Sequence, residues 1–560
     1  MKLDPINRIG DINPQLFREL KGRFIPRNLM VAAGISLLTQ FLVVLGFLGE
    51  LPDRHHEYDR YCTGGKPEYH YHQLRCLMDS FGDPEINWQL WWSDVFLWTT
   101  TIGIFVLLVG ATYILISDLD REERRGTLNF IRLSPQSTRQ ILVGKLLGAP
   151  SLLFVGCVLA FPLHLLAASH AGISLNLVAL YYVVLFACSA FCFSGAIFLG
   201  LVSKWMGGFQ AWLGSSLVLM CLFLTSLMRV EDAPIDVLKL FSPSSLIPYL
   251  MPEQFAHAIR LFNYDMDDLI LHSVEWHWFV LPIGITATAL TAAMVVACSA
   301  CTVWIWQFID RRFRNPHTTL VSKQQSYWVT GCYTILVLGL APHGYEFENL
   351  NWILGFNLIF FAGLMAALSP QRQVCIDWAR YRHMSPERKQ GLFNELMSSD
   401  KSPALLAIAF NLLEAQLIIL PWILMWHNSK VDRLYGAFSL LLNFSMLLFC
   451  ASIAQLVMMM KSKKRGLWAM TSVSGIVALP PLVLLVLSAH PDTTPLFWMF
   501  TVFPWEALNY AEAMTVMVSV LTQWAAIGAI STQYSRKLRE AGVSASKALA
   551  AGGAESLQRI

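Results

Sequence analysis

Residues 120–149, DREERRGTLNFIRLSPQSTRQILVGKLLGA, place nine charged side chains between two apolar runs. The Gly144-Lys145 pair is the part of this segment that could hold a phosphate. A phosphate-binding loop of the form G-x-x-x-x-G-K-[ST] also needs an earlier glycine and a Ser or Thr after the lysine. The segment lacks both, and the full pattern occurs nowhere in the chain. We therefore expect no ATP hydrolysis by this chain, so that energy for transport would come from a partner or from an ion gradient.

The same segment has the signals of two short helices. We predict that Asp120, Glu122 and Glu123 begin a helix, because carboxylates stabilise the positive end of the helix dipole. Ser134 is the predicted N-cap of a second helix, with Pro135 at its first position. The sequence therefore predicts a helix, a break and a second short helix, which together could serve as a handle for a soluble partner.

Other residues with suitable chemistry lie in predicted loops outside the membrane. Cys62 and Cys76 could form a disulfide in an oxidising compartment, or Cys76 could bind zinc together with His70 and His72. A cluster of acids and histidines at 264–278 could be written as the metal site of a membrane enzyme. The competing interpretation of both regions is a polar loop, and we predict no catalytic residue, no bound metal and no cofactor.

Polar side chains within the apolar runs suggest a second class of transporter. His164, Glu414 and Gln416 would lie inside the membrane, where ionisable groups are costly and often mark an ion or substrate pathway. A secondary transporter driven by an ion gradient would use such residues. The alternative is that neighbouring helices satisfy each of them.

The composition indicates a membrane protein. Of its 560 residues, 55% are apolar and only 14% are charged, whereas soluble domains contain about 25% charged residues. The apolar residues gather in runs of about 20, enough for a helix to cross a bilayer. The formal net charge is +3, and no basic cluster interleaved with aromatic residues indicates a nucleic-acid partner.

The apolar runs predict an all-α membrane protein with twelve spans. Their predicted ranges are 29–50, 93–116, 149–168, 176–202, 209–228, 278–307, 328–343, 351–369, 404–427, 435–460, 469–489 and 511–532. The run at 328–343 is short. Cytoplasmic loops hold an excess of Lys and Arg, and with both termini inside, 32 of the 41 basic residues are cytoplasmic.

Two modules of six spans are predicted. The first covers 29–307, with a charged inner segment at 118–148 and outer loops at 51–92 and 229–277; the second covers 328–532, with an inner segment at 370–403. A linker at 308–327 joins them, an amphipathic helix within 1–28 precedes them, and a tail at 533–560 follows. Ungapped alignment of 126–147 with 391–412 matches one glycine, one asparagine and two serines. Chance remains the alternative explanation for so short a match.

At these residues the chain resembles the permeases of ABC-2 type transporters. The resemblance rests on an acidic and Arg-rich start, Gly-Thr-Leu, a Leu-Ser-Pro turn and Ile-Leu-x-Gly-Lys. The amphipathic stretch 13–24 and the Pro-containing outer segment 241–252 are similar to family features as well. The residues that this resemblance makes candidates for coupling to an ATPase are Arg121, Glu122, Glu123, Gly126, Ser134, Pro135, Ser137, Arg139, Gly144 and Lys145.

What the resemblance implies is two permease modules fused in one chain of a cytoplasmic (inner) membrane exporter. Its partner would be a separate ABC ATP-binding subunit, in two copies, which would hold the ATP and Mg²⁺; Arg139 and Lys145 would contact it. In the second half the candidates are Glu387, Arg388, Gly391, Ser399 and Ser402. That half has Asp400 instead of the proline and lacks the Gly-Lys pair. The cargo is not indicated.

Overall fold

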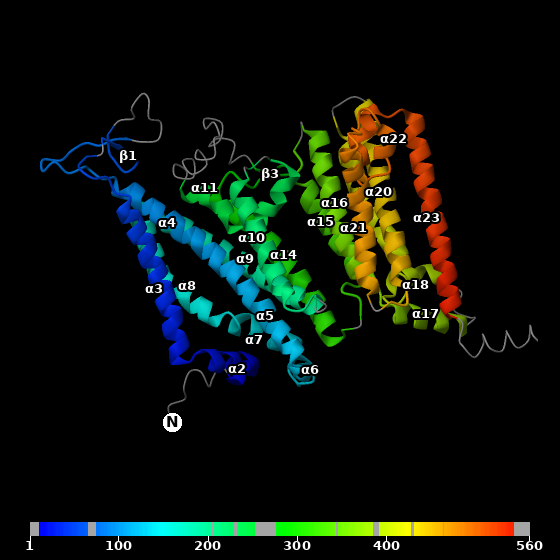
Figure 1. The fold of residues 1–560 in the computed structure, drawn as a ribbon, viewed down its shortest axis with the longest axis horizontal. Helices are drawn as coiled ribbons and strands as arrows, with labels where there is room; N and C mark the ends of the chain where they lie inside the picture. The colour runs from blue at the N-terminus through cyan, green and yellow to red at the C-terminus, as the bar shows by residue number, and fades with distance from the viewer. Residues whose placement is uncertain are drawn as a thin grey trace, which may run out of the picture. The chain divides into compact units, whose positions relative to one another are not determined.

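The structure is a computed structural model that describes residues 10–55, 57–64, 74–203, 206–228, 230, 232–251, 276–316, 318–342, 345–384, 391–426, 430–462 and 464–542. The described chain divides into two compact units, unit 1 with Met1–Asp232 and Asp236–Arg314, and unit 2 with Ala233–Ile235 and Asn315–Ile560. Figure 1 shows that both consist almost entirely of helices.

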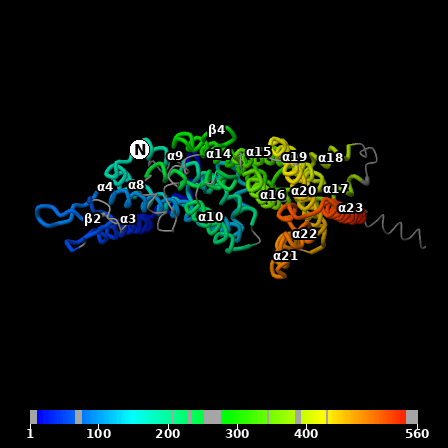
Figure 2. The backbone as a smooth tube through the Cα atoms, turned by 90° about the horizontal axis from the view of Figure 1, so that it is seen from above, coloured from blue at the N-terminus to red at the C-terminus, as the bar shows by residue number. Residues whose placement is uncertain are grey.

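Unit 1 begins with an amphipathic helix and contains five long apolar helices, one of them composite, and one more that leads out of the unit. Its helices are α2 (Pro14–Arg23), α3 (Pro26–Gly49), α4 (Trp88–Phe105), η1 (Val106–Gly110), α5 (Ala111–Arg124), α6 (Thr127–Arg132), α7 (Thr138–Gly148), α8 (Ser151–His170), α9 (Leu175–Val202), α10 (Phe209–Leu227) and α14 (Ala287–Arg314). Helices α3, α4 and α8 pack side by side (Figures 1 and 2).

The connections of unit 1 at the end away from α2 are short elements. Two antiparallel pairs of strands occur there, β1 (Tyr58–Asp59) with β2 (Leu74–Arg75), and β3 (His277–Trp278) with β4 (Leu281–Pro282). Between α10 and α14 the chain forms η3 (Pro234–Phe241), η4 (Pro243–Leu246) and α11 (Ile247–Leu250). These turns occupy the segment where the sequence predicts a Pro-containing turn before the sixth span.

One helix of unit 1 is much longer than a membrane needs. Trp88–Arg124 is continuous over 37 residues through α4, the π-helical turn η1 and α5, which corresponds to about 55 Å. A bilayer core is roughly 30 Å thick. The helix is therefore longer than the apolar layer, and its charged last turns, which hold Asp118 and Glu122, are the part that we expect outside it.

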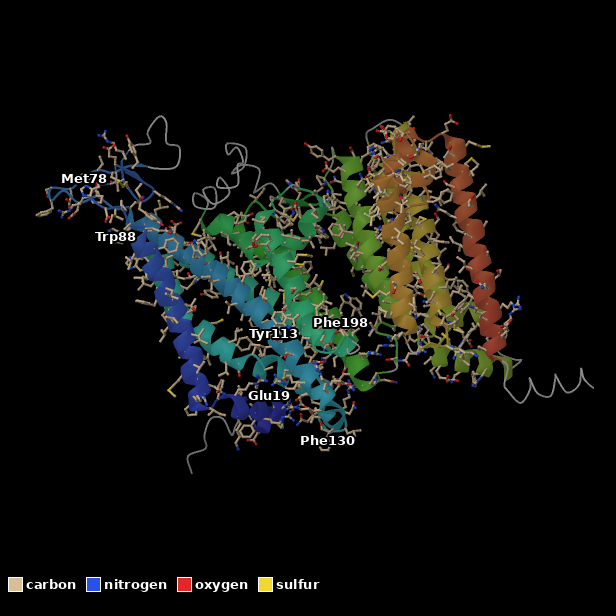
Figure 3. All side chains as sticks on the ribbon, viewed as in Figure 1. Glu19, Met78, Trp88, Tyr113, Phe130 and Phe198 are labelled. Atoms are coloured by element: carbon tan, nitrogen blue, oxygen red, sulfur yellow. A yellow bond between two sulfur atoms is a disulfide. The ribbon has the colours of Figure 1, made fainter. Side chains whose placement is uncertain are left out.

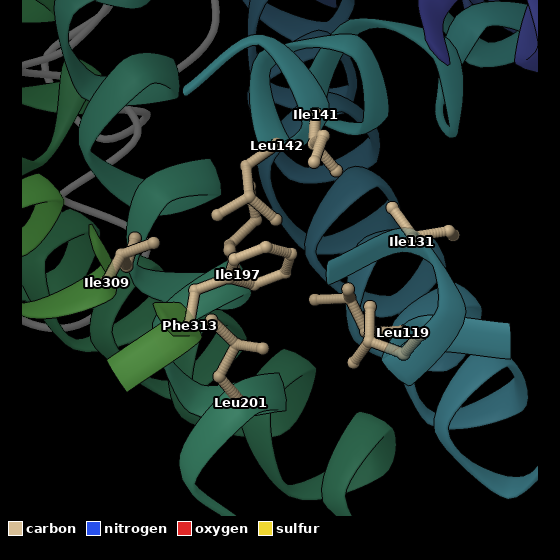
Figure 4. Close-up of a cluster of buried hydrophobic side chains, with 9 residues drawn as sticks. Leu119, Ile131, Ile141, Leu142, Ile197, Leu201, Ile309 and Phe313 are labelled. Carbon is tan, nitrogen blue, oxygen red and sulfur yellow. The ribbon is translucent and has the colours of Figure 1, made fainter. Parts of the chain in front are cut away.

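An apolar cluster fixes α6 and α7 to the long helices at the α2 end of unit 1 (Figure 4). Leu128 and Ile131 come from α6, and Ile141 and Leu142 from α7. They pack against side chains of α5, α9 and α14, namely Leu119, Ile197, Leu201, Ile309 and Phe313. The segment that the sequence singles out is therefore built into the core on one side.

Unit 2 contains a second series of six long helices. Its elements are α15 (Lys323–Leu338), α16 (Glu346–Leu368), α17 (Arg372–Met384), α18 (Leu392–Ser398), α19 (Leu405–Leu424), α20 (Lys430–Met458), α21 (Arg465–Val486), α22 (Pro495–Trp498), η6 (Pro504–Tyr510) and α23 (Ala513–Gly542). The short helices α17 and α18 lie between the second and third long helices, as α6 and α7 do in unit 1.

Eleven helices of the described chain are long and apolar enough to cross a membrane, where the sequence predicts twelve spans. The predicted span 328–343 corresponds to α15, which has 16 residues and reaches only about 24 Å. Two helices also extend beyond the predicted spans. Helix α14 continues to Arg314 and α15 begins at Lys323, so the connection between them is 315–322, and α23 continues ten residues into the predicted tail.

Candidate functional site

The charged segment folds as two short helices, although their termini differ from the prediction. Asp120 and Glu122 belong to the C-terminal end of α5 and do not start a helix. Gly126 has φ of +72°, a left-handed conformation that favours glycine, and turns the chain into α6. The N-cap of α7 is Ser137, which forms a capping box with Gln140, so the prediction that Ser134 caps this helix is wrong.

Carboxylates at the C-terminal end of a helix oppose the helix dipole, and unit 1 compensates them with three cations. Lys145 Nζ lies 2.7 Å from an oxygen of Asp118, 2.8 Å from one of Glu122 and 3.4 Å from one of Glu19. Arg23 binds Asp118 at 2.8 Å, and Arg18 binds Glu122 at 2.7 Å. Three carboxylates and three cations thus form a neutral cluster, which we call the α2–α5–α7 ion cluster.

Lys145 is the centre of this cluster and is only 1% exposed. Burial by itself lowers the pKa of Lys145, but the charges of Asp118, Glu19 and Glu122 outweigh it and raise that pKa above its ordinary value of 10.5. The ammonium is therefore charged and fully engaged. In this structure the Lys145 side chain is directed inward and positions α2 and α5 against α7. Its contact with an ATPase stays a prediction.

Two glycines of α7 let α2 approach closely. A Cβ at Gly148 would lie 2.4 Å from Cβ of Glu19, and one at Gly144 would lie 2.8 Å from the backbone nitrogen of Leu16. Asn13, the N-cap of α2, donates from its side-chain nitrogen to the carbonyl oxygen of Gln140 at 2.8 Å. The Gly-Lys pair thus has a structural role in seating the N-terminal helix.

The opposite side of the segment is free of such contacts and faces solvent. Phe130 is 79% exposed and Leu133 is 85% exposed, beyond the apolar length of the helices, at the end of unit 1 that also holds Glu19 (Figure 3). The candidates Arg121, Gly126, Pro135, Ser137 and Arg139 are exposed as well. We call Phe130, Leu133 and Arg139 the exposed α6–α7 surface; it combines large apolar side chains with positive charge.

Unit 2 repeats the left-handed glycine before a short helix, but in the described chain no further short helix follows that one. Gly391 has φ of +97° and precedes α18, as Gly126 precedes α6. After α18 the non-helical connection 399–404 leads to the long helix α19. Ser399 and Ser402 lie at this corner, where the hydroxyl of Ser402 is within 2.9 Å of the carbonyl oxygen of Ser399. Glu387 and Arg388 lie outside the described residues.

A second buried lysine, which the sequence reasoning missed, holds that corner. Lys323, at the start of α15, is 1% exposed, and its ammonium donates to the oxygens of Leu396, Ser402 and Pro403 at 2.6–2.9 Å. All three acceptors are neutral. Burial lowers the pKa of Lys323 to about 8, and the charge of Asp400 opposes this shift only in part.

Among the polar candidates inside the apolar helices, His164 is fully satisfied. Its Nε2 lies 2.9 Å from the hydroxyl of Thr100, and its Nδ1 lies 2.8 Å from that of Tyr182. The Thr100 hydroxyl already donates to the carbonyl oxygen of Phe96, so Nε2 must carry the proton that joins them. Since a charged imidazole is costly in an apolar layer, Nδ1 accepts from Tyr182 and the ring is neutral.

Glu414 and Gln416 of α19 are less well satisfied. Glu414 is half-buried against Gly331 of α15, whose Cβ would lie 3.0 Å from Oε1. Its Oε2, and both polar atoms of Gln416, are buried and have no hydrogen-bond partner in the described chain. One helical turn away, Asn411 binds Ser326 and Thr330 of α15. The α15–α19 contact is therefore a polar seam.

At the other end of unit 1, Cys62 and Cys76 form a disulfide. The loop that it closes is anchored to α4 by Asp94, a buried residue that sequence reasoning missed, which binds Arg60 at 2.6 Å and the hydroxyl of Tyr61 at 2.9 Å. The sequence marks Asp94 only as a single acidic residue in the apolar run WQLWWSDVFLW. His70 and His72, and all the acids at 264–278, lie outside the described residues.

Only one group of acids in the described chain lies close enough to share a metal ion, namely Glu19, Asp118 and Glu122. Lys145 Nζ already lies among them. Comparison of the chain with protein-family models, with curated proteins and with solved structures finds no match in any of the three. The fold and this site define a helical, multi-pass membrane protein with a structured charged segment at one end of unit 1.

Proposed function

We propose that this chain is the membrane-spanning subunit of an ATP-driven exporter, with two permease modules of the ABC-2 type in one chain. The observation that carries the proposal is the α6–α7 segment. It is fixed to the long helices by the α2–α5–α7 ion cluster and an apolar core, while Phe130, Leu133 and Arg139 project into solvent. Such an element can transmit the movement of a bound partner to the helices.

The partner in this proposal is a soluble ATP-binding subunit, two copies of which close together when ATP binds. Their movement would reach unit 1 through the exposed α6–α7 surface and unit 2 through α18. The missing counterpart of α7 makes the second contact smaller. In this arrangement both termini are cytoplasmic, α15 is a short twelfth span, and the membrane is the cytoplasmic one.

Three substitutions in the exposed part of the α6–α7 segment test the proposal. Arg139→Glu, Phe130→Asp and Pro135→Gly should reduce transport and partner-stimulated ATP hydrolysis without unfolding the long helices, because all three side chains are exposed. Lys461→Glu is a matched control, since Lys461 is exposed at the connection between α20 and α21, a predicted cytoplasmic loop. Unchanged transport in all three variants would remove the docking role of this surface.

One observation favours a second candidate function, transport driven by an ion gradient. The buried Oε2 of Glu414, without a hydrogen-bond partner in the described chain, is the kind of group that could bind a proton or a cation inside a membrane. In that case Glu414→Gln should abolish transport, whereas removal of ATP should leave it intact. An ATP-driven exporter gives the reverse pair of results.

A further inference from the structure

A large apolar cavity lies within unit 1, apart from the charged segment. Its volume is about 750 Å³, and it is lined by residues of α3, α4, α8 and α9 together with η1. This volume is within the range of about 300–1,000 Å³ of small-molecule sites. All four helices are candidate membrane spans, so lipid is a natural candidate for the occupant of the cavity.

Helix α3 leaves this cavity open to lipid. None of its residues is buried, because it is held mainly along one side, where the hydroxyl of Ser36 donates to the carbonyl oxygen of Gly156 at 2.8 Å. Lining positions on α3 run from Arg27 to Val43, a distance of about 24 Å along the helix. An extended acyl chain matches a slot of this length.

The polar groups along the cavity discriminate between ligands. Deep inside, His164 uses both ring nitrogens on Thr100 and Tyr182, so it offers no free charge to a ligand. At the end near α2, Arg27 is exposed and has no ion-pair partner in the described chain. The cavity therefore combines an apolar interior with a single cation at one end.

We propose that this cavity binds a membrane phospholipid from the leaflet at the α2 end, with an acyl chain in the cavity and the phosphate on Arg27. An arginine guanidinium forms charge-assisted, often bidentate, hydrogen bonds with phosphate. The bound lipid would fill the space between α3 and the remaining helices and so complete the packing of a helix that has no buried residue of its own.

The cavity can be filled from a position that tolerates a side chain. Gly103 lines it, and a Cβ at Gly103 would meet nothing within 4 Å. Gly34 of α3 is equally open but does not line the cavity. The variants Gly103→Trp and Gly34→Trp therefore add the same side chain in the cavity and outside it. Ala160→Trp is a second cavity-filling variant if the first does not fold.

The test uses the full chain in vesicles of phosphatidylcholine that contain a small fraction of phosphatidylglycerol with a photoreactive acyl chain. After illumination, mass spectrometry of peptides should find the label on the cavity-lining parts of α3, α4 and α8. Gly103→Trp should reduce that labelling by about tenfold, since it occupies the site, and Gly34→Trp should not. Arg27→Gln should reduce it by about threefold or more, and Arg27→Lys should retain most of it.

Three results would overturn the proposal. The first is equal labelling of the cavity helices in the parent and in folded Gly103→Trp or Ala160→Trp. The second is labelling of these helices no stronger than that of the exposed helix α21. The third is a co-purified polypeptide seated in the cavity, which would make it a protein interface.

Discussion

Two of the buried lysines, Lys145 and Lys323, occupy opposite electrostatic environments. Lys145 lies among three carboxylates, whereas Lys323 binds three neutral oxygens. Burial disfavours an ammonium in both places, but only Lys145 has enough negative charge around it for its pKa to rise. The first lysine therefore stabilises its site as a cation, while the second is held as a cation against the cost of desolvation.

Removing Lys145 should destabilise unit 1 strongly. Lys145→Met leaves three carboxylates with only Arg18 and Arg23, and breaking a buried pair typically costs about 3–5 kcal/mol. Thermal unfolding of the purified chain in detergent measures this loss. Lys21→Met is the control, since Lys21 is an exposed lysine of α2 and its loss should change the free energy of unfolding by less than about 0.5 kcal/mol. Equal melting temperatures for both variants would refute the structural role of Lys145.

Titration of Lys323 should make unit 2 more stable at alkaline pH. Its native pKa of about 8 is below the ordinary 10.5, so between these values the unfolded chain binds a proton that the native chain has released. Stability then rises with pH across this window and is independent of this group below it. The difference in unfolding free energy between the parent and Lys323→Met, measured from pH 7 to 10.5, should grow by about 1–3 kcal/mol. A flat difference would contradict the assignment.

The proposed function also predicts the effect of replacing Glu414. As part of a polar seam in an ATP-driven exporter, it should tolerate replacement by an isosteric amide. Glu414→Gln should therefore keep transport within about a factor of three of the parent, which corresponds to roughly 0.7 kcal/mol in the barrier. Complete loss in a folded variant would instead favour the ion-gradient function.

At the scale of elements, the joint between α2 and α7 depends on two glycines. Gly148→Ala would bring a methyl group to 2.4 Å from Cβ of Glu19, which α2 can relieve only by moving away from α7. We expect faster proteolysis at Arg18 and Lys21 in this variant. Gly22→Ala is the matched control, because nothing lies within 4 Å of its Cβ and alanine favours a helix over glycine. Equal cleavage rates in the two variants would contradict the close packing of α2 on α7.

The elements were predicted better than their termini. Apolar runs predict long helices because a span must satisfy its own backbone hydrogen bonds, and Pro14 after Asn13 predicts the start of α2. The helix of 120–124 was placed wrongly because the span continues into it without a break. Nothing local in the sequence separates the first turn of one helix from the last turn of another when the charges are mixed.

The pairing of distant charges was beyond sequence reasoning. Glu19, Asp118 and Lys145 are separated by up to 126 positions, and no periodicity links them. Their contact depends on how α2, α5 and α7 pack. The disulfide partners Cys62 and Cys76, by contrast, are close in sequence and share one loop, so that their pairing was a natural hypothesis.

At the scale of the whole molecule, the two units share an order of elements. Each has six long helices, a glycine in the left-handed conformation before a short helix between the second and third, and Pro-initiated 3₁₀ turns before the sixth. They differ at the charged segment, where unit 1 has α7 with its buried lysine and unit 2 has none. This asymmetry is the structural reason to expect one strong and one weak docking contact.

The measurement that tests the central proposal most directly is purification of the tagged chain from its host in mild detergent, with co-purifying proteins identified and assayed for ATP hydrolysis. The account predicts a stoichiometric ATPase that is lost when Phe130→Asp and Arg139→Glu are combined, and retained in Lys461→Glu. An intact chain that recovers no ATPase, even after crosslinking in the membrane, would contradict it.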